Sequence, residues 1–125
     1  MADVLVIENS KKLADLFASD LMLAGFRVKT AVGYHEGVRL LDASTYQLIV
    51  LNPFFRDGSA DDMFEKLTRD NLLDRVLVCS AGAERVKSCN EKGIHAVMKP
   101  VQLMKLGQLI TQIARVSEKR IGGLT

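Results

Sequence analysis

Four short polar segments of this sequence follow apolar runs, and their side chains are of types that do chemistry. The segments are Glu8-Asn9, Asn52-Pro53, Ser80-Ala81 and Lys99-Pro100. If the runs are parallel strands, an acid, two amides, a hydroxyl and an amine meet at one place, because ligands of parallel sheets lie beyond the carboxyl ends of the strands. The sequence therefore predicts a polar site at that edge of a sheet.

The apolar runs have the composition of buried strands. Residues 4–7, 48–51 and 76–79 are mostly leucine and β-branched residues without polar alternation, as in parallel strands covered on both faces. Weaker strands are expected at 26–32 and 94–98. Apolar residues recur at helical spacing in five further segments, 13–24, 34–41, 63–67, 86–89 and 103–113.

A strand–helix order repeated five times predicts a single α/β domain. Right-handed crossovers put helices on both faces of a parallel sheet. We therefore expect a doubly wound (βα)5 domain with the flavodoxin-like strand order 2-1-3-4-5. Ser10 and Ser59 suit the N-caps of the first and third helices, and Gly25 suits a left-handed C-cap. The domain is expected to span residues 1–116, with 117–125 as a tail or the start of a linker.

Composition argues against several classes of protein. A chain of 125 residues that is 48% hydrophobic and 26% charged is typical of one folded domain. Seventeen Lys and Arg against fifteen Asp and Glu leave a formal charge of +2, too small an excess to indicate nucleic-acid binding. No apolar run approaches the roughly 18 residues that span a membrane, and none forms a signal-peptide core. Two cysteines make no disulfide framework, so we expect a soluble, cytoplasmic protein.

The strand-end residues resemble those of receiver domains of two-component response regulators, over about residues 2–116. In that family an acidic pair ends the first strand, a phosphoacceptor Asp ends the third, and a Ser or Thr ends the fourth. A Lys-Pro, usually with a cis bond, ends the fifth. The separations match the family's usual spacing, except that the step from Ser80 to Lys99 is about one helical turn short. The corresponding residues here are Glu8 with Asn9, Asn52, Ser80, and Lys99 with Pro100.

Asn52 is the departure from the family that matters most for function. An aspartyl phosphate needs a carboxylate nucleophile, and the nitrogen lone pair of an amide is delocalised. Deamidation through a succinimide is disfavoured, because it needs the backbone N–H of the next residue and Pro53 has none. Of the family's three acidic positions only Glu8 keeps a charge. Mg²⁺ prefers one or two carboxylates plus phosphate oxygens, so its binding is expected to be weak or absent.

These departures predict a pseudo-receiver: a receiver-like domain of bacterial phosphorelay signalling that is not phosphorylated, is no enzyme and needs no cofactor. It would act as a protein-interaction module. By resemblance its partners bind helix four, strand five and helix five, which correspond to residues 84–91, 94–98 and 102–115. Ala96 stands where the family commonly has an aromatic switch residue, so the surface is expected to be constitutive. A homodimer is also possible.

Two other interpretations stay open. The chain could be a phosphorylatable receiver with another acceptor, such as Asp57. It could instead be a flavodoxin-like module that binds a small ligand, although no glycine-rich phosphate loop follows a strand. Phe54 and Phe55 either plug the site or form a contact surface. No zinc-ligand spacing is present among the histidines and cysteines, which are His35, His95, Cys79 and Cys89.

Overall fold

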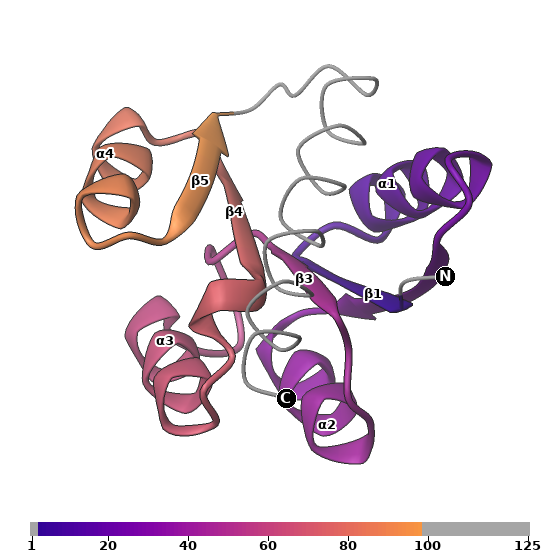
Figure 1. Cartoon of the computed structure of the whole chain (residues 1–125), viewed down its shortest axis with the longest axis horizontal. Coiled ribbons are helices and arrows are strands. Elements are labelled where there is room, and N and C mark those ends of the chain that lie inside the picture. Colours follow the sequence, from indigo (N-terminus) through magenta and orange to yellow (C-terminus); the bar gives the residue numbers. More distant parts are fainter. Residues whose placement is uncertain (1–2, 99–125) are drawn as a thin grey trace, which may run out of the picture.

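A five-stranded parallel sheet organises the chain in the computed structural model, which describes residues 3–98 (Figure 1). The strands lie in the order β2-β1-β3-β4-β5, and all neighbours are parallel. The predicted doubly wound fold and its strand order are therefore confirmed. The strands are β1 (Asp3–Glu8), β2 (Arg27–Val32), β3 (Leu48–Leu51), β4 (Val76–Ser80) and β5 (His95–Met98).

Helices cover both faces of this sheet. One face carries α1, and the opposite face carries α2, α3 and α4 (Figure 1). The expected fifth helix, Lys99-Pro100 and the boundary at residue 116 lie outside the described residues. Within residues 3–98 no helix is long and apolar enough to cross a membrane. The helices are α1 (Lys11–Leu23), α2 (Tyr34–Ala43), α3 (Ala60–Arg69) and α4 (Ala83–Glu91), with a short 3₁₀ turn at Leu73–Arg75.

Local side chains set several helix ends. The hydroxyl of Ser10 accepts a hydrogen bond from the Leu13 N–H at 3.3 Å, and that of Ser59 accepts one from the Asp62 N–H at 3.0 Å. Gly25 follows the C-cap of α1 with φ +97°, a conformation that glycine adopts without strain. The two predicted N-caps and the predicted left-handed C-cap are confirmed.

The sheet separates two apolar layers, which explains the unbroken apolar runs of β1 and β3. Successive side chains of a strand point to opposite faces. One layer joins Leu5, Ile7, Ile49 and Leu51 to Met63 and Leu67 of α3, and the other joins Val4, Val6, Leu48 and Val50 to Phe17 and Leu21 of α1. Cys79 and Cys89 form no disulfide, and they belong to different layers on opposite faces of the sheet.

Candidate functional site

The carboxyl ends of β1 and β3 bring three of the predicted site residues into one hydrogen-bonded cluster. The two strands are paired with Ile7 opposite Leu51, so the residues that follow meet at one edge. The Asn52 side chain donates from Nδ2 to Oε1 of Glu8 at 2.7 Å and to Oδ1 of Asn9 at 3.4 Å. The backbone N–H of Asn9 donates to the same Glu8 oxygen at 3.0 Å.

Glu8 is the buried charge of this cluster, with 1% of its surface exposed. A buried carboxylate must be hydrogen-bonded or paired, because its desolvation is costly. Asn52 and Asn9 each supply an N–H donor to it. An aspartate at position 52 would instead place a second carboxylate about as close to Glu8, and that repulsion would need a cation or a proton to offset it. The amide thus replaces a repulsion with a hydrogen bond.

The other end of the Asn52 amide holds the loop that follows β3. Its Oδ1 accepts a hydrogen bond from the Phe54 N–H at 3.2 Å, which is a local turn that Asn and Asp side chains favour. Its backbone N–H donates to the carbonyl of Ile7 at 2.9 Å. Asparagine therefore donates on one side and accepts on the other. An ionised aspartate could only accept.

Ser80 lies at the same edge of the sheet, at the end of β4, and is half-buried. Its hydroxyl accepts a hydrogen bond from the Gly82 N–H at 3.1 Å, and this bond stabilises the turn that follows β4. Among residues 3–98 no hydrogen bond joins Ser80 to Glu8, Asn9 or Asn52. Lys99 and Pro100 fall outside the described residues, so the predicted cluster is placed only in part.

Ala96 lies in β5 opposite Val78 and is half-buried. Its backbone N–H donates to the side-chain carbonyl of Asn90 in α4 at 3.2 Å. This bond ties the edge strand to the helix before it. Asn90 could not be predicted from the sequence, because nothing in a helical pattern marks a side chain that reaches the next strand.

Asp57 has a role that sequence reasoning missed. Its carboxylate accepts hydrogen bonds from the backbone N–H groups of Tyr34 at 2.8 Å and His35 at 3.1 Å. These are first-turn N–H groups of α2, which have no carbonyl partner within the helix. The bond from Tyr34, and then that from His35, lowers the pKa of Asp57. The carboxylate considered as an alternative phosphoacceptor is thus engaged in capping α2.

Two glycines permit this contact between the loop and α2. Gly33 is the N-cap of α2, has φ +96° and offers no side chain for capping. A Cβ at Gly33 would lie 3.0 Å from both carboxylate oxygens of Asp57, and one at Gly58 would lie 2.3 Å from Cγ of Tyr34. A helix start without a capping side chain is the signal that points to a remote cap.

The two phenylalanines of the loop have different roles. Phe55 packs edge-to-face on Tyr34, with ring centroids 5.6 Å apart, and contacts the core layer beneath α2 and α3. Phe54 is 71% exposed. The sequence left open whether these two rings pack inward or form a contact surface. Phe55 packs against the core, and Phe54 is exposed to solvent.

The residues of the cluster do not fit a Mg²⁺ site. Among residues 3–98 no group of three or more His, Cys, Asp or Glu side chains could hold a metal ion. Glu8 is the one carboxylate of the cluster, and Asn52 turns an N–H group toward it, which cannot coordinate a cation.

Solved structures similar to this chain include receiver domains. The receiver domain of a Francisella response regulator matches with a TM-score of 0.83 and 19% identity, over 94% of this chain and 99% of that one. A CheY-like receiver domain protein from Methanospirillum hungatei JF-1 matches with a TM-score of 0.85 and 18% identity, over 96% and 98%. The Thermotoga maritima response regulator TrrA, in complex with Mg²⁺ and BeF, matches with a TM-score of 0.78 and 16% identity, over 90% of this chain and 99% of that one.

These similarities define the class of the fold, which is that of CheY-like response regulator receiver domains. The sequence itself matches no protein-family model and no curated protein. Structures this far apart in sequence share an architecture, while function depends on the side chains at the site.

Proposed function

We propose that this chain is a receiver-like domain of two-component signalling that accepts no phosphoryl group and works by binding a protein partner. The supporting observation is the 2.7 Å hydrogen bond from Nδ2 of Asn52 to Glu8. It places an amide N–H where the family's acceptor carboxylate would attack phosphorus. An amide nitrogen with a delocalised lone pair is no nucleophile for that step.

The charge of the cluster supports the same proposal. Phosphoryl transfer relies on a metal ion that neutralises the developing charge, and Mg²⁺ requires carboxylate ligands. TrrA is in complex with Mg²⁺ and BeF. In this chain Glu8 is the one carboxylate of the cluster, and it is already bonded to Asn52 and Asn9. The Glu8 carboxylate is hydrogen-bonded within the protein without metal or phosphate, and the domain acts as an interaction module rather than as an enzyme.

The partner surface is proposed on residues 84–91, 94–98 and 102–115, of which the structure describes the first two. Cys89 is the buried residue of α4, so this helix turns nearly all of its side chains outward. Next to it β5 is an edge strand of the sheet, with Met98 47% exposed. A small residue at Ala96 leaves no aromatic ring to switch between two positions. The surface is then available at all times.

A phosphorylation assay tests the central claim. The purified chain is incubated with acetyl phosphate and Mg²⁺ and weighed by intact mass spectrometry, with the Methanospirillum receiver domain as the positive control. We expect no added phosphate on this chain. A stable gain of one phosphate would contradict the proposal. If Asp57→Asn then abolished that gain, Asp57 would be identified as the acceptor.

A binding assay tests the interaction role. Partners are captured from the native cell with wild-type protein, with the double variant Arg85→Glu and Lys87→Glu on α4, and with the control Lys12→Glu on α1. We expect one partner to be retained by wild type and control, to be lost by the α4 variant, and to be unaffected by acetyl phosphate. Equal retention by all three proteins would contradict the assigned surface.

A further inference from the structure

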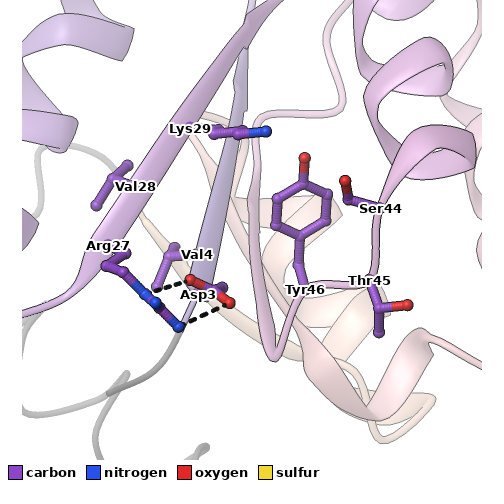
Figure 2. A pocket seen from close by; sticks show the side chains of 8 residues that line it. All are labelled: Asp3, Val4, Arg27, Val28, Lys29, Ser44, Thr45 and Tyr46. Atoms are coloured by element: carbon purple, nitrogen blue, oxygen red, sulfur yellow. Dashed lines mark hydrogen bonds and ion pairs between the residues drawn. The ribbon is translucent and has the colours of Figure 1, made fainter.

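The two edge strands of the sheet are protected in different ways. An edge strand leaves its outward N–H groups without a partner strand, and charged side chains commonly protect it. At one edge, β2 carries the exposed side chains of Arg27 and Lys29, and Nε of Arg27 lies 2.7 Å from Oδ1 of Asp3 (Figure 2). At the other edge, β5 has no Lys, Arg, Asp or Glu. There a side chain of α4, which lies beside β5, binds an N–H group of the strand (Figure 1).

That side chain belongs to Asn90, whose Oδ1 accepts a hydrogen bond from the Ala96 N–H at 3.2 Å. Ala96 is paired with Val78 of β4, and within residues 3–98 no strand lies on the other side of β5. Because this N–H is bonded to α4 rather than to β4, it lies on the outward side of the strand. A backbone N–H can only donate, so it must face the carbonyl end of the amide. The orientation of the exposed Asn90 side chain is thereby fixed.

The turn from α4 to β5 brings the side chain of Asn90 within reach of the strand. Gly93 follows the C-cap of α4 with φ +78°, and its N–H donates to the Asn90 carbonyl at 3.1 Å. The N–H of Ile94 donates to the Cys89 carbonyl at 2.9 Å. These are the two bonds of a Schellman motif, which ends the helix. Asn90 therefore bonds to the turn through its backbone and to Ala96 in the strand through its side chain.

Within residues 3–98 few other contacts hold α4 in place. Cys89 is its buried residue and Val86 is half-buried, whereas α1 and α3 each bury three residues. The guanidinium of Arg85 lies 5.9 Å from the centre of the Phe64 ring in α3, a weak contact at an exposed position. Segments with few buried apolar contacts open and move most easily. One hydrogen bond therefore matters more for the position of α4 than it would for a well-packed helix.

We propose that the Asn90 side chain is a latch, a hydrogen bond that holds α4 and β5 in one arrangement. Without this bond α4 would stay joined to β5 by the turn at Gly93, but it could tilt about that turn. Residues 84–91 and 94–98 are the described part of the proposed partner surface, so the latch would keep that surface in a single form. This consequence rests on the proposed function. The latch itself is tested without a partner, so its failure is distinguishable from failure of the phosphorylation and capture assays.

NMR of the ¹⁵N-labelled full chain tests the latch with two variants. Asn90→Ala removes the acceptor, while Asn90→Asp keeps an acceptor oxygen on a side chain of the same shape. In Asn90→Ala we expect the Ala96 amide hydrogen to exchange with solvent about fivefold faster or more. We also expect relaxation dispersion to appear at residues 86–91 and 94–98. Asn90→Asp should behave as wild type. Alanine is a better helix former than asparagine, so the added motion could not come from a weakened helix.

Lys87→Ala, at another exposed position of α4, is the control and should leave both measurements unchanged. Asn90 is itself exposed, so both of its variants retain the fold. Unchanged exchange at Ala96 in Asn90→Ala, or equally fast exchange in Asn90→Asp or the control, would overturn the proposal. Faster exchange without dispersion would also overturn it, because the bond would then not restrain α4. Dispersion of the same size in wild type would show that the two elements already move.

Discussion

The side-chain amide of Asn52 donates a 2.7 Å hydrogen bond to the buried carboxylate of Glu8. The same amide accepts from the Phe54 N–H at 3.2 Å, so it joins the end of β1 to the loop after β3. A donor and an acceptor are both used, and no ionised carboxylate offers both. Position 52 is therefore a structural part of this site.

Asn52→Asp is expected to destabilise the protein. It removes the donor to Glu8 and sets two carboxylates against each other, at a cost of about 2 kcal/mol in the free energy of unfolding at neutral pH. Asn52→Ala loses the hydrogen bonds without the repulsion, and its cost should be about 1 kcal/mol smaller. Urea unfolding followed by circular dichroism measures both. An aspartate variant as stable as wild type would show that Glu8 does not need the amide.

Asn52→Asp alone is not expected to restore phosphorylation. Asn9 still leaves the site one carboxylate short of the family's pattern, so Mg²⁺ at ordinary millimolar concentration should bind too weakly to support transfer. The double variant Asn9→Asp with Asn52→Asp should take up more phosphate from acetyl phosphate than either single variant. Intact mass spectrometry measures the uptake. Robust uptake by Asn52→Asp alone would contradict the charge argument.

Asp57 should make stability depend on pH in the acid range. Its pKa in the folded state lies below the ordinary 3.8, because the carboxylate accepts from the N–H groups of Tyr34 and His35. The contribution is fully present above that ordinary value and is lost as the pH falls through the lower folded value. Asp57→Asn keeps one acceptor oxygen and has no charge to titrate.

The urea midpoint of Asp57→Asn should therefore lie below that of wild type at pH 7. The gap should narrow at a pH well below the ordinary 3.8, where protonation removes the Asp57 charge from wild type as well. Glu65→Gln, at an exposed position in the interior of α3, is the matched control. A gap for Asp57→Asn that stays constant between the two pH values would show that the carboxylate's charge is not what caps α2.

Much of the fold could be predicted because burial on both faces leaves a plain trace in the sequence. The runs at residues 4–7 and 48–51 are apolar throughout, since β1 and β3 face a core layer on each side. A serine N-cap bonds to the N–H three residues further along the chain, so it can be recognised from a short stretch of sequence. Helical spacing did not fix the buried face of α1, where Ala14 is fully buried while Leu16 is 50% exposed.

The part of the site that lies at the ends of the strands could be predicted from the sequence. Parallel pairing brings Glu8 and Asn52 to one edge, and the order of strands is enough to expect that. The capping of α2 could not be predicted in the same way, because Asp57 and Tyr34 are 23 residues apart and lie in different elements. The separate roles of Phe54 and Phe55 depend on the direction the loop takes, which no periodicity encodes.

Gly58→Ala tests how tightly the loop is fastened to α2. A Cβ at Gly58 would lie 2.3 Å from Cγ of Tyr34. The Tyr34 ring also packs edge-to-face on Phe55, which restricts its movement. Either the ring or the loop must move, so we expect a loss of about 2–3 kcal/mol in the free energy of unfolding. Gly82→Ala is the control, since its nearest neighbour, the Ser80 hydroxyl, lies 3.6 Å away and its φ of −89° suits alanine. Because Gly82 is the N-cap of α4 and alanine is a poorer N-cap than glycine, this control should cost about 1 kcal/mol or less. Equal unfolding midpoints for the two variants would mean that the loop shifts freely and that Asp57 and Phe55 do not anchor it.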